Sequence, residues 1–434
     1  MTNRPKFSSQ WATVMTMTGL AVGLGNVWRF PYMMGQHGGG AFLVMYLLLM
    51  LAFAVPAMSA EWAFGRSTGR GPIGAMAAAF GKTPGTAAGI IVLLSVLVTA
   101  SYYSLVVGNV AYSTWFAVRH GFAEQTLETY QAELGNHPLQ LAFALLVVLA
   151  STLIVTRGLK RGVELANVVL VPLFGVAAVY LIFAVLRLDG AFDKLTGFIT
   201  PDFSRLNVDV AFAALGQACF SVGLSGTVGV VLGSYLRRRQ AVLGTALTTA
   251  GLDVMAALLA ALFVVPAVLM FGIDMTAGPG LLFDTLPHLF SLLPGGRWLA
   301  GIFLLSWVSV ALLSIVATLD TLTTGFGELQ FLAPLRRWLT PAFGLAIAIL
   351  VTPIAFNPQW LGMLDTIFGS GMFILGSLLA ITGLGWGLGK RTTAQEVDPN
   401  GTMPWLVFWI RWVIPPTVAV ILIGFVYSSV TGGH

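Results

Sequence analysis

Three carboxylates lie inside long apolar stretches of this chain, at Asp253, Asp320 and Asp365. Ionisable side chains are rare in membrane-spanning segments, where they usually mark the path of an ion or polar solute; the alternative is a salt bridge between helices. Polar groups also adjoin two similar glycine-rich stretches, Ala21–Asn26 (AVGLGN) and Ser221–Gly226 (SVGLSG). Several oxygen atoms at one place suit a hard cation, so these residues indicate a polar binding site within a bilayer.

The composition excludes a water-soluble fold. Of 434 residues 57% are hydrophobic and 9% are charged, whereas a soluble domain carries about a quarter charged residues. Cys219 is the only cysteine, which excludes an intramolecular disulfide and a cysteine metal cluster. The net charge of +5 comes from small basic groups between apolar runs, so it indicates membrane topology rather than nucleic-acid binding.

Hydropathy and helix breakers predict an all-α membrane protein of about eleven helices, forming a single transmembrane domain over residues 1–434. The expected spans are 11–35, 40–65, 86–118, 139–156, 164–186, 209–236, 241–271, 298–329, 338–354, 361–388 and 404–428. The polar segment Met1–Gln10 leads directly into the first span without a small-residue cleavage site, so no signal peptide is expected.

The distribution of basic residues predicts a cytoplasmic N-terminus. With that orientation the segments expected outside hold only Arg119, Arg187, Lys194, Arg205 and Arg297, and the other loop arginines and lysines lie inside.

The two glycine-rich stretches predict helices broken at mid-membrane. The second stretch lies five spans after the first, and because five is odd the second copy runs through the membrane in the opposite sense. This predicts a 5+5 inverted repeat, with repeats at 8–186 and 209–390 and an additional helix 11 at 403–430. Paired interruptions of this kind point to a midplane binding site in secondary transporters. The alternative for a single glycine cluster is close helix packing.

The chain resembles the neurotransmitter:sodium symporter family, particularly its short bacterial, leucine-transporter-like amino acid transporters. The resemblance covers nearly the whole chain. It is carried by Ala21–Pro31 (AVGLGNVWRFP), Gly38–Phe42 (GGGAF), Glu61–Arg66 (EWAFGR), Tyr102-Tyr103, Gly216–Ser221 (GQACFS), Gly233–Tyr235 (GSY) and Ala317–Thr321 (ATLDT).

This resemblance implies two sodium sites. The first would use the Ala21 carbonyl, Asn26, Ser221, Asp253 and the carboxylate of the substrate. The second would use the carbonyls of Gly19, Val22 and Ala317 with the side chains of Asp320 and Thr321.

The resemblance also implies how an amino acid would bind. Its carboxylate would meet sodium, the amides around Gly25 and the Tyr103 hydroxyl, and its ammonium would meet helix carbonyls. Monoamine members carry Asp where this chain has Gly23, which favours a substrate with its own carboxylate. The full expected set is Ala21, Gly23, Leu24, Gly25, Thr99, Tyr103, Phe220, Ser221, Gly223, Gly226, Thr321, Thr324 and Gly325. Glycine at positions 223, 226 and 325 predicts a wide pocket for a bulky side chain, although backbone shifts would fill the same volume.

Gating residues follow from the same resemblance. Arg29 and Asp365 match an outer gate, and Arg4 and Tyr235 match parts of an inner gate. The usual acidic partner of the inner gate is missing, which leaves other contacts such as Glu328. Glu61 matches a buried glutamate that accepts bonds from amides freed by the broken helix 6; the alternative is a helix-packing carboxylate.

The chain departs from the family at the chloride site. Asp253 replaces the usual Asn, and Ala257 lacks the hydroxyl of chloride-dependent relatives. A fixed charge beside Tyr46, Gln217 and Ser221 would take over the role of chloride, which predicts chloride independence. Alternatively Asp253 exchanges a proton.

The sequence therefore predicts a sodium-coupled amino acid symporter that works by alternating access. It is expected as a monomer or weak dimer in the bacterial inner membrane, with the lipid bilayer and an amino acid, but no nucleic acid, as partners. No hydrolytic or metalloenzyme pattern is present, so an enzyme is not expected. The alternative is a sodium-dependent amino acid sensor or channel-like protein on the same scaffold.

Overall fold

The computed structural model describes residues 5–23, 25–272 and 281–431, and within them every regular element is helical. The helices are α1 (Gln10–Ala21), α2 (Phe30–Gln36), α3 (Gly40–Leu49), α4 (Val55–Thr68), α5 (Pro72–Phe80), α6 (Lys82–Arg119), α7 (Glu124–Leu134), α8 (His137–Thr156), α9 (Leu165–Leu186), α10 (Ala191–Ile199), α11 (Val208–Ser221), α12 (Val228–Tyr235), α13 (Val242–Phe271), α14 (Leu286–Leu292), α15 (Gly296–Phe326), α16 (Leu339–Phe356), α17 (Trp360–Leu364), α18 (Met372–Thr382), α19 (Gly389–Val397), α20 (Pro404–Phe408) and α21 (Ile414–Thr431).

Eleven helical stretches account for the predicted spans. Among the described residues nine are uninterrupted and apolar enough to cross a bilayer: Gly40–Thr68, Lys82–Arg119, His137–Thr156, Leu159–Leu186, Val242–Phe271, Gly296–Phe326, Gln330–Phe356, Trp360–Gly387 and Pro404–Val426. The other two are the interrupted pairs α1–α2 and α11–α12. The predicted all-α membrane architecture, with its first and sixth spans broken, is confirmed.

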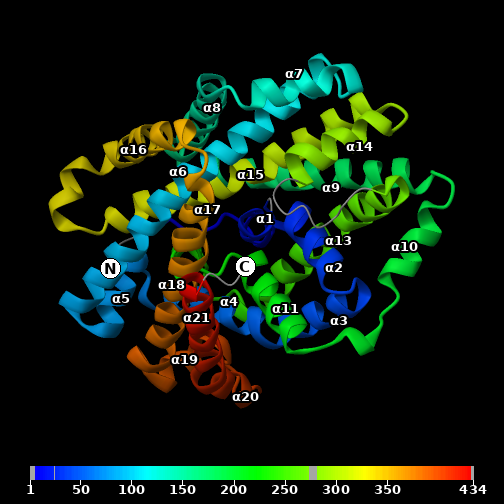
Figure 1. Cartoon of the computed structure of the whole chain (residues 1–434). Coiled ribbons are helices and arrows are strands. Elements are labelled where there is room, and N and C mark those ends of the chain that lie inside the picture. Colours follow the sequence, from blue (N-terminus) through cyan, green and yellow to red (C-terminus); the bar gives the residue numbers. More distant parts are fainter. Residues whose placement is uncertain (1–4, 24, 273–280, 432–434) are drawn as a thin grey trace.

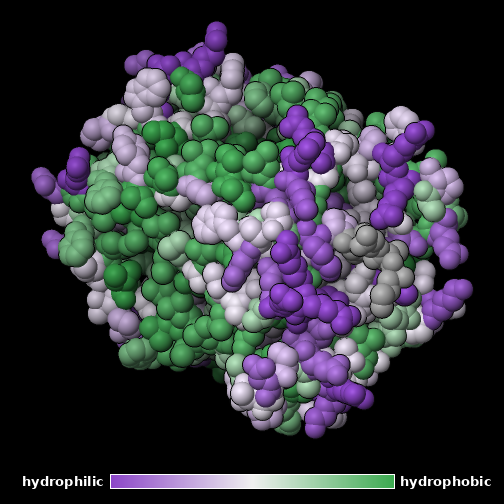
Figure 2. All heavy atoms as spheres, turned by 180° about the vertical axis from the view of Figure 1, so that it is seen from behind, coloured by the Kyte–Doolittle hydropathy of each residue, from purple (hydrophilic) through white to green (hydrophobic). Residues whose placement is uncertain are grey.

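The outer surface is that of a protein solvated by lipid. Large apolar side chains stand more than half exposed along α8, α9, α16 and α21, among them Leu146, Val176, Leu345 and Ile423. In Figure 2 hydrophobic residues cover much of the visible face, while hydrophilic residues gather mainly at its margins and in one stripe. A surface of this kind is stable against hydrocarbon but not in water.

The first broken helix occupies the interior of the bundle. Figure 1 shows α1 near the centre of the molecule, where it packs against α9, α13 and α15. The second half of the other broken helix, α12, packs against α4 and α15. Helices α6, α8, α15 and α16 pack on one another beside this group, so the two breaks are enclosed by intact helices.

A buried arginine joins three separate parts of the chain at one end of the bundle. The Arg66 Nε atom on α4 lies 2.5 Å from Glu396 Oε2 on α19, and its Nη2 atom donates to the Glu396 carbonyl at 2.8 Å. Its Nη1 atom donates to the Gln240 carbonyl at 2.5 Å, in the loop before α13. The planar guanidinium thus ties α4, the loop before α13 and α19 together through fixed geometry.

We expect Gly226→Ala to destabilise the fold strongly. Gly226 has φ +65°, and an added Cβ would collide with the Gly376 carbonyl on α18. The combined strain and clash should cost about 3 kcal/mol. Thermal unfolding of the purified protein in detergent measures this. Gly216→Ala in α11 is the matched control, because nothing lies within 4 Å of its Cβ position. Equal stability of the two variants would contradict the packing described for Gly226.

Candidate binding site at the two helix breaks

The first break follows Ala21. Val22 has an extended backbone with ψ 112°, and its N–H donates to the Thr18 carbonyl at 2.7 Å. The chain resumes in a π-helical turn, Gly25–Arg29, and then in α2. The last carbonyls of α1 therefore lack the partners that a continuous helix would give them, so they are available to a ligand.

The second break spans Val222–Thr227, between α11 and α12. Gly223 and Gly226 have positive φ angles of +67° and +65°, which a side chain would strain. The freed Gly226 N–H donates to Glu61 Oε1 at 3.0 Å, and Glu61 is 1% exposed. The sequence-based role of Glu61 is confirmed: it satisfies a backbone amide that the break leaves without a helical partner.

A buried polar cluster joins the two breaks to α13. Asn26 Nδ2 donates to Asp253 Oδ1 at 2.6 Å and to Ser221 Oγ at 3.2 Å. The Ser221 hydroxyl donates to Asp253 Oδ2 at 2.6 Å. All three side chains are at most 2% exposed. The structure thus brings together the side chains expected at the first sodium site, and their oxygens are of the kind that a hard cation prefers.

The residues expected at the second sodium site lie where α1 meets α15. Thr321 Oγ1 donates to the Ala317 carbonyl at 2.8 Å, one turn earlier in α15. Asp320 Oδ2 accepts a hydrogen bond from Tyr235 at 3.0 Å. Gly19 faces α15 as well, since an added Cβ would lie 3.1 Å from Leu313 Cδ1. Among the described residues no three His, Cys, Asp or Glu side chains cluster, so a cation here would rely on the single carboxylate of Asp320 with carbonyl and hydroxyl oxygens.

Asn167 is a buried polar neighbour of this second site that the sequence alone does not single out. Its Oδ1 atom lies against Gly19 so closely that a Cβ there would collide with it. Its Nδ2 atom donates to the Val163 carbonyl at 2.8 Å, and Oδ1 has no hydrogen-bond partner in the described part of the chain. The only signal in the sequence is one amide within an apolar helix.

The expected substrate residues gather around the first break. A Cβ at Gly23 would lie 3.6 Å from the Tyr103 hydroxyl and 3.4 Å from Ser314 Oγ. At Gly25 it would collide with the Phe220 ring, which stands 41% exposed. Tyr103 on α6 and Phe220 on α11 therefore both lie next to the broken segment. Leu24 lies outside the described residues.

The glycines expected to widen the pocket do not all do so. Gly226 faces the Gly376 carbonyl, and a Cβ at Gly325 would lie 2.5 Å from Leu93 Cδ1. At these two positions a neighbouring backbone and a leucine side chain already fill the volume. Thr99 and Thr321 are buried, and Thr99 Oγ1 has no hydrogen-bond partner among the described residues.

The outer-gate residues are close but are not paired. The Arg29 guanidinium lies over the Phe220 ring, 4.3 Å from its centroid, and Arg29 Nη1 is buried without a partner within the described chain. Asp365 Oδ1 instead accepts a hydrogen bond from Tyr102 at 2.8 Å. Tyr102, not assigned a role from the sequence, thus holds the carboxylate that was expected to meet Arg29.

At the other end, the N-terminal segment is latched onto α12. Lys6 Nζ donates to the carbonyls of Ser234 and Leu236 at 2.7 and 3.1 Å. The Arg237 guanidinium donates to the carbonyls of Phe7 and Ser8 at 3.0 and 2.8 Å. We refer to these four contacts as the N-terminal latch.

The other expected inner-gate residues have different surroundings. Tyr235 contacts the Phe7 ring edge-on and hydrogen-bonds Asp320, while Arg4 lies outside the described residues. Glu328 accepts from the amides of Gly71 and Gly74 at 2.5 and 2.8 Å and so caps α5. Glu328 thus has a structural role as a helix cap, which the sequence alone does not predict.

The expected chloride-site residues lie next to the central cluster. Tyr46 lies near Asp253 and Ser221, and both Tyr46 and Asp253 are 0% exposed. The Tyr46 hydroxyl and both polar atoms of the Gln217 side chain have no hydrogen-bond partner in the described part of the chain.

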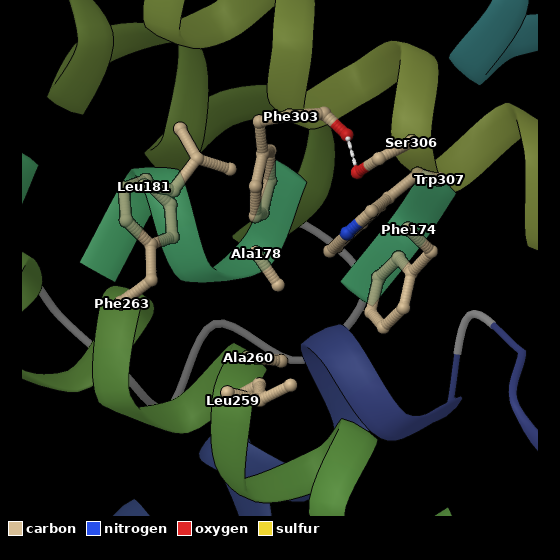
Figure 3. Close-up of a pocket in the computed structure, with 9 residues that line it drawn as sticks. All are labelled: Phe174, Ala178, Leu181, Leu259, Ala260, Phe263, Phe303, Ser306 and Trp307. Carbon is tan, nitrogen blue, oxygen red and sulfur yellow. Dashed lines mark hydrogen bonds between the residues drawn. The ribbon is translucent and has the colours of Figure 1, made fainter. Parts of the chain in front are cut away.

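A small cavity elsewhere is unsuited to a zwitterion. It lies between α9, α13 and α15, and Figure 3 shows its lining of aromatic and aliphatic side chains, including Phe174, Leu181 and Phe263, with the Trp307 indole and Ser306 as the polar members. None of the expected site residues lines it. The two charges of an amino acid would be left without partners there.

This geometry agrees with comparisons to known proteins. A model of the "Sodium:neurotransmitter symporter family" matches residues 4–126 and 117–432, so the chain belongs to this family of sodium-dependent transporters. It is therefore a multi-pass membrane transporter and not an enzyme.

Individual relatives span most of the chain. The sodium-dependent transporter YhdH of Bacillus subtilis (strain 168) is 31% identical over 74% of this chain and 72% of its own length. A sodium-dependent transporter of Haemophilus influenzae is 27% identical over 97% of this chain and 98% of its own. The crystal structure of MhsT in complex with L-phenylalanine superimposes with a TM-score of 0.86 at 27% identity, covering 97% of this chain and 99% of MhsT.

We expect Tyr102 and Asp365 to be energetically coupled. Tyr102→Phe removes a partly buried hydrogen bond to a carboxylate, which is worth about 2 kcal/mol. Asp365→Asn should lower the free energy of unfolding by less in the Tyr102→Phe background than in the unmodified protein. The effects of the two substitutions should therefore not add. Thermal unfolding of the two single variants and the double variant measures the coupling. Strictly additive effects would show that the bond contributes nothing.

Proposed function

We propose that this protein uses the sodium gradient to carry an amino acid into the cell by alternating access, in the bacterial inner membrane with its N-terminus cytoplasmic. The observation that supports this most strongly is the buried cluster of Asn26, Ser221 and Asp253 beside both helix breaks. It places a carboxylate, an amide and a hydroxyl where broken helices free backbone dipoles, which suits a cation and a zwitterion together.

In this proposal two sodium ions are co-transported with the amino acid. The first would be held by Asn26, Ser221, Asp253 and the Ala21 carbonyl, and the substrate carboxylate would complete its ligands. Binding of ion and substrate would thereby be coupled, since each supplies charge that the other needs. The second would be held by Asp320 and Thr321 with the carbonyls of Gly19, Val22 and Ala317.

The proposed substrate is a hydrophobic or aromatic amino acid. Gly23 offers no acidic side chain for an amine, which favours a substrate with its own carboxylate. Its carboxylate would meet the amides around Gly25 and the Tyr103 hydroxyl, and its side chain would pack on the exposed face of Phe220. Support also comes from the likeness to MhsT, whose structure contains L-phenylalanine.

The architecture in this proposal is a pair of inverted repeats, 8–186 and 209–390, followed by an additional helix at 403–430. The two broken spans, one in each repeat, support that division. The protein would act as a monomer or weak dimer, because each copy contains both breaks and all the proposed ligands.

Uptake into vesicles tests the proposal. Purified protein reconstituted into liposomes should accumulate labelled L-phenylalanine under an inward sodium gradient but not under a potassium gradient. Asn26→Ala removes one proposed ligand and the amide that links three elements, so uptake should fall at least about tenfold. Asn357→Ala is the matched control, since Asn357 is the same residue type at the end of α16, away from both breaks.

Two results would contradict symport. One is equal accumulation without sodium, and the other is sodium-dependent binding of a panel of amino acids without accumulation, which is the behaviour of a sensor. A normal elution profile of Asn26→Ala in gel filtration separates loss of transport from loss of folding.

We further propose that transport is independent of chloride, with Asp253 supplying the negative charge. Asp253 is fully buried and bonded by Asn26 and Ser221, and a second anion beside it would be repelled.

Replacing chloride with gluconate should therefore leave uptake by the unmodified protein unchanged. Asp253→Asn keeps an oxygen ligand but removes the charge, so its uptake should fall about tenfold and be partly restored by chloride. Asp193→Asn, an exposed carboxylate on α10, is the control and should behave like the unmodified protein. Chloride-dependent uptake by the unmodified protein would overturn this part of the proposal.

A further inference from the structure

One arginine lies within a membrane span and is only half-buried. Arg411 belongs to the apolar stretch Pro404–Val426, in the π-helical turn Trp409–Val413. It is half-buried, and its neighbours Phe408 and Trp412 are 58% and 55% exposed. Charged side chains in membrane spans normally face the bundle interior, so a half-buried arginine beside exposed apolar side chains needs a partner of its own.

The Arg411 side chain is held in place by reciprocal bonds to the neighbouring span. Its Nε atom donates to the Gly385 carbonyl at 2.9 Å, while the Trp386 indole N–H donates to the Arg411 carbonyl at 3.0 Å. A Cβ at Gly385 would lie 3.3 Å from Arg411 Cγ, so the stem of the arginine packs on bare backbone. These contacts fix the guanidinium before any ligand binds, which lowers the entropy cost of binding.

A pair of indole rings lies beside Arg411 at the membrane boundary. The rings of Trp386 and Trp412 are 5.6 Å apart, and Arg411 Cζ lies 5.9 Å from the Trp412 centroid. Trp386 is next to the end of the stretch Trp360–Gly387 and bonds to Arg411, so both lie at the same face of the bilayer. Tryptophan is enriched at that level, beside lipid headgroups.

The Arg411 guanidinium retains nitrogens that can bind a ligand. Within the described residues no hydrogen bond engages either Nη nitrogen of Arg411, and two parallel N–H groups match the oxygens of a phosphate. Exposed Lys390 and Arg391 follow Trp386 closely in the chain, and Glu396 of the same helix is already bonded by Arg66. Basic pockets between membrane helices are suited to anionic lipid headgroups.

We propose that Arg411, Trp386 and Trp412 form a binding site for the phosphodiester headgroup of an anionic phospholipid. The Arg411 Nη groups donate to the phosphate oxygens, and the indoles pack against the glycerol region and upper acyl chain. With the N-terminus inside, the site faces the cytoplasmic leaflet.

Native mass spectrometry of the full chain, released from an equimolar mixture of phosphatidylglycerol and phosphatidylcholine, tests the site. The unmodified protein should retain phosphatidylglycerol preferentially. Arg411→Gln should lower that retention about tenfold, because a charge-assisted bidentate contact is lost. Trp386→Phe keeps an aromatic ring but removes the indole N–H and part of the ring surface, so it should give an intermediate loss.

Arg119→Gln is the matched control. Arg119 is exposed and lies 5.9 Å from the Trp115 ring, the same cation–π distance, but its side chain makes no bond to a neighbouring helix among the described residues. Its substitution should leave retention unchanged. Equal retention of the two lipids by the unmodified protein, or equal losses for Arg411→Gln and Arg119→Gln, would overturn the proposal. The comparison of lipids on the unmodified protein does not depend on the folding of any variant or on transport activity.

Discussion

The need to satisfy backbone polar groups inside hydrocarbon governs this structure. An interrupted helix exposes amides and carbonyls, and each would be costly to leave without a partner. The protein meets this need with buried side chains: Glu61 accepts from the Gly226 amide, and Asn26 Oδ1 accepts from the Gly23 amide at 3.1 Å. Intact helices then surround both breaks. The unusual backbone conformation is therefore stabilised by the same polar side chains that make the site attractive to ions.

The central cluster also connects three elements of the fold. Asn26, Ser221 and Asp253 belong to three different elements, and their bonds hold the first break, the second break and α13 together. A ligand that competes for these oxygens must act on all three elements at once. Binding and helix position are thereby linked through a few short contacts, without a long chain of intermediates.

Much of this arrangement is predictable from sequence because it follows from local chemistry. Apolar runs fix the number of spans, and glycine clusters beside Asn26 and Ser221 locate both breaks. What sequence does not predict depends on distant contacts. Glycine at 226 and 325 suggests open space, but α18 and Leu93 fill it. Asp365 is held by Tyr102 rather than Arg29, and Glu328 caps α5. Each of these outcomes is decided by how helices far apart in the chain approach one another, which residue type and spacing do not encode.

The N-terminal latch limits which residues at this end of the molecule are constrained in sequence. Both of its cations, Lys6 and Arg237, donate to main-chain carbonyls, of Ser234, Leu236, Phe7 and Ser8. A carbonyl is present whatever side chain its residue carries. The N-terminal latch therefore places no requirement on the side chains at the four acceptor positions. It requires only the two cationic side chains and a backbone path that brings the carbonyls within their reach.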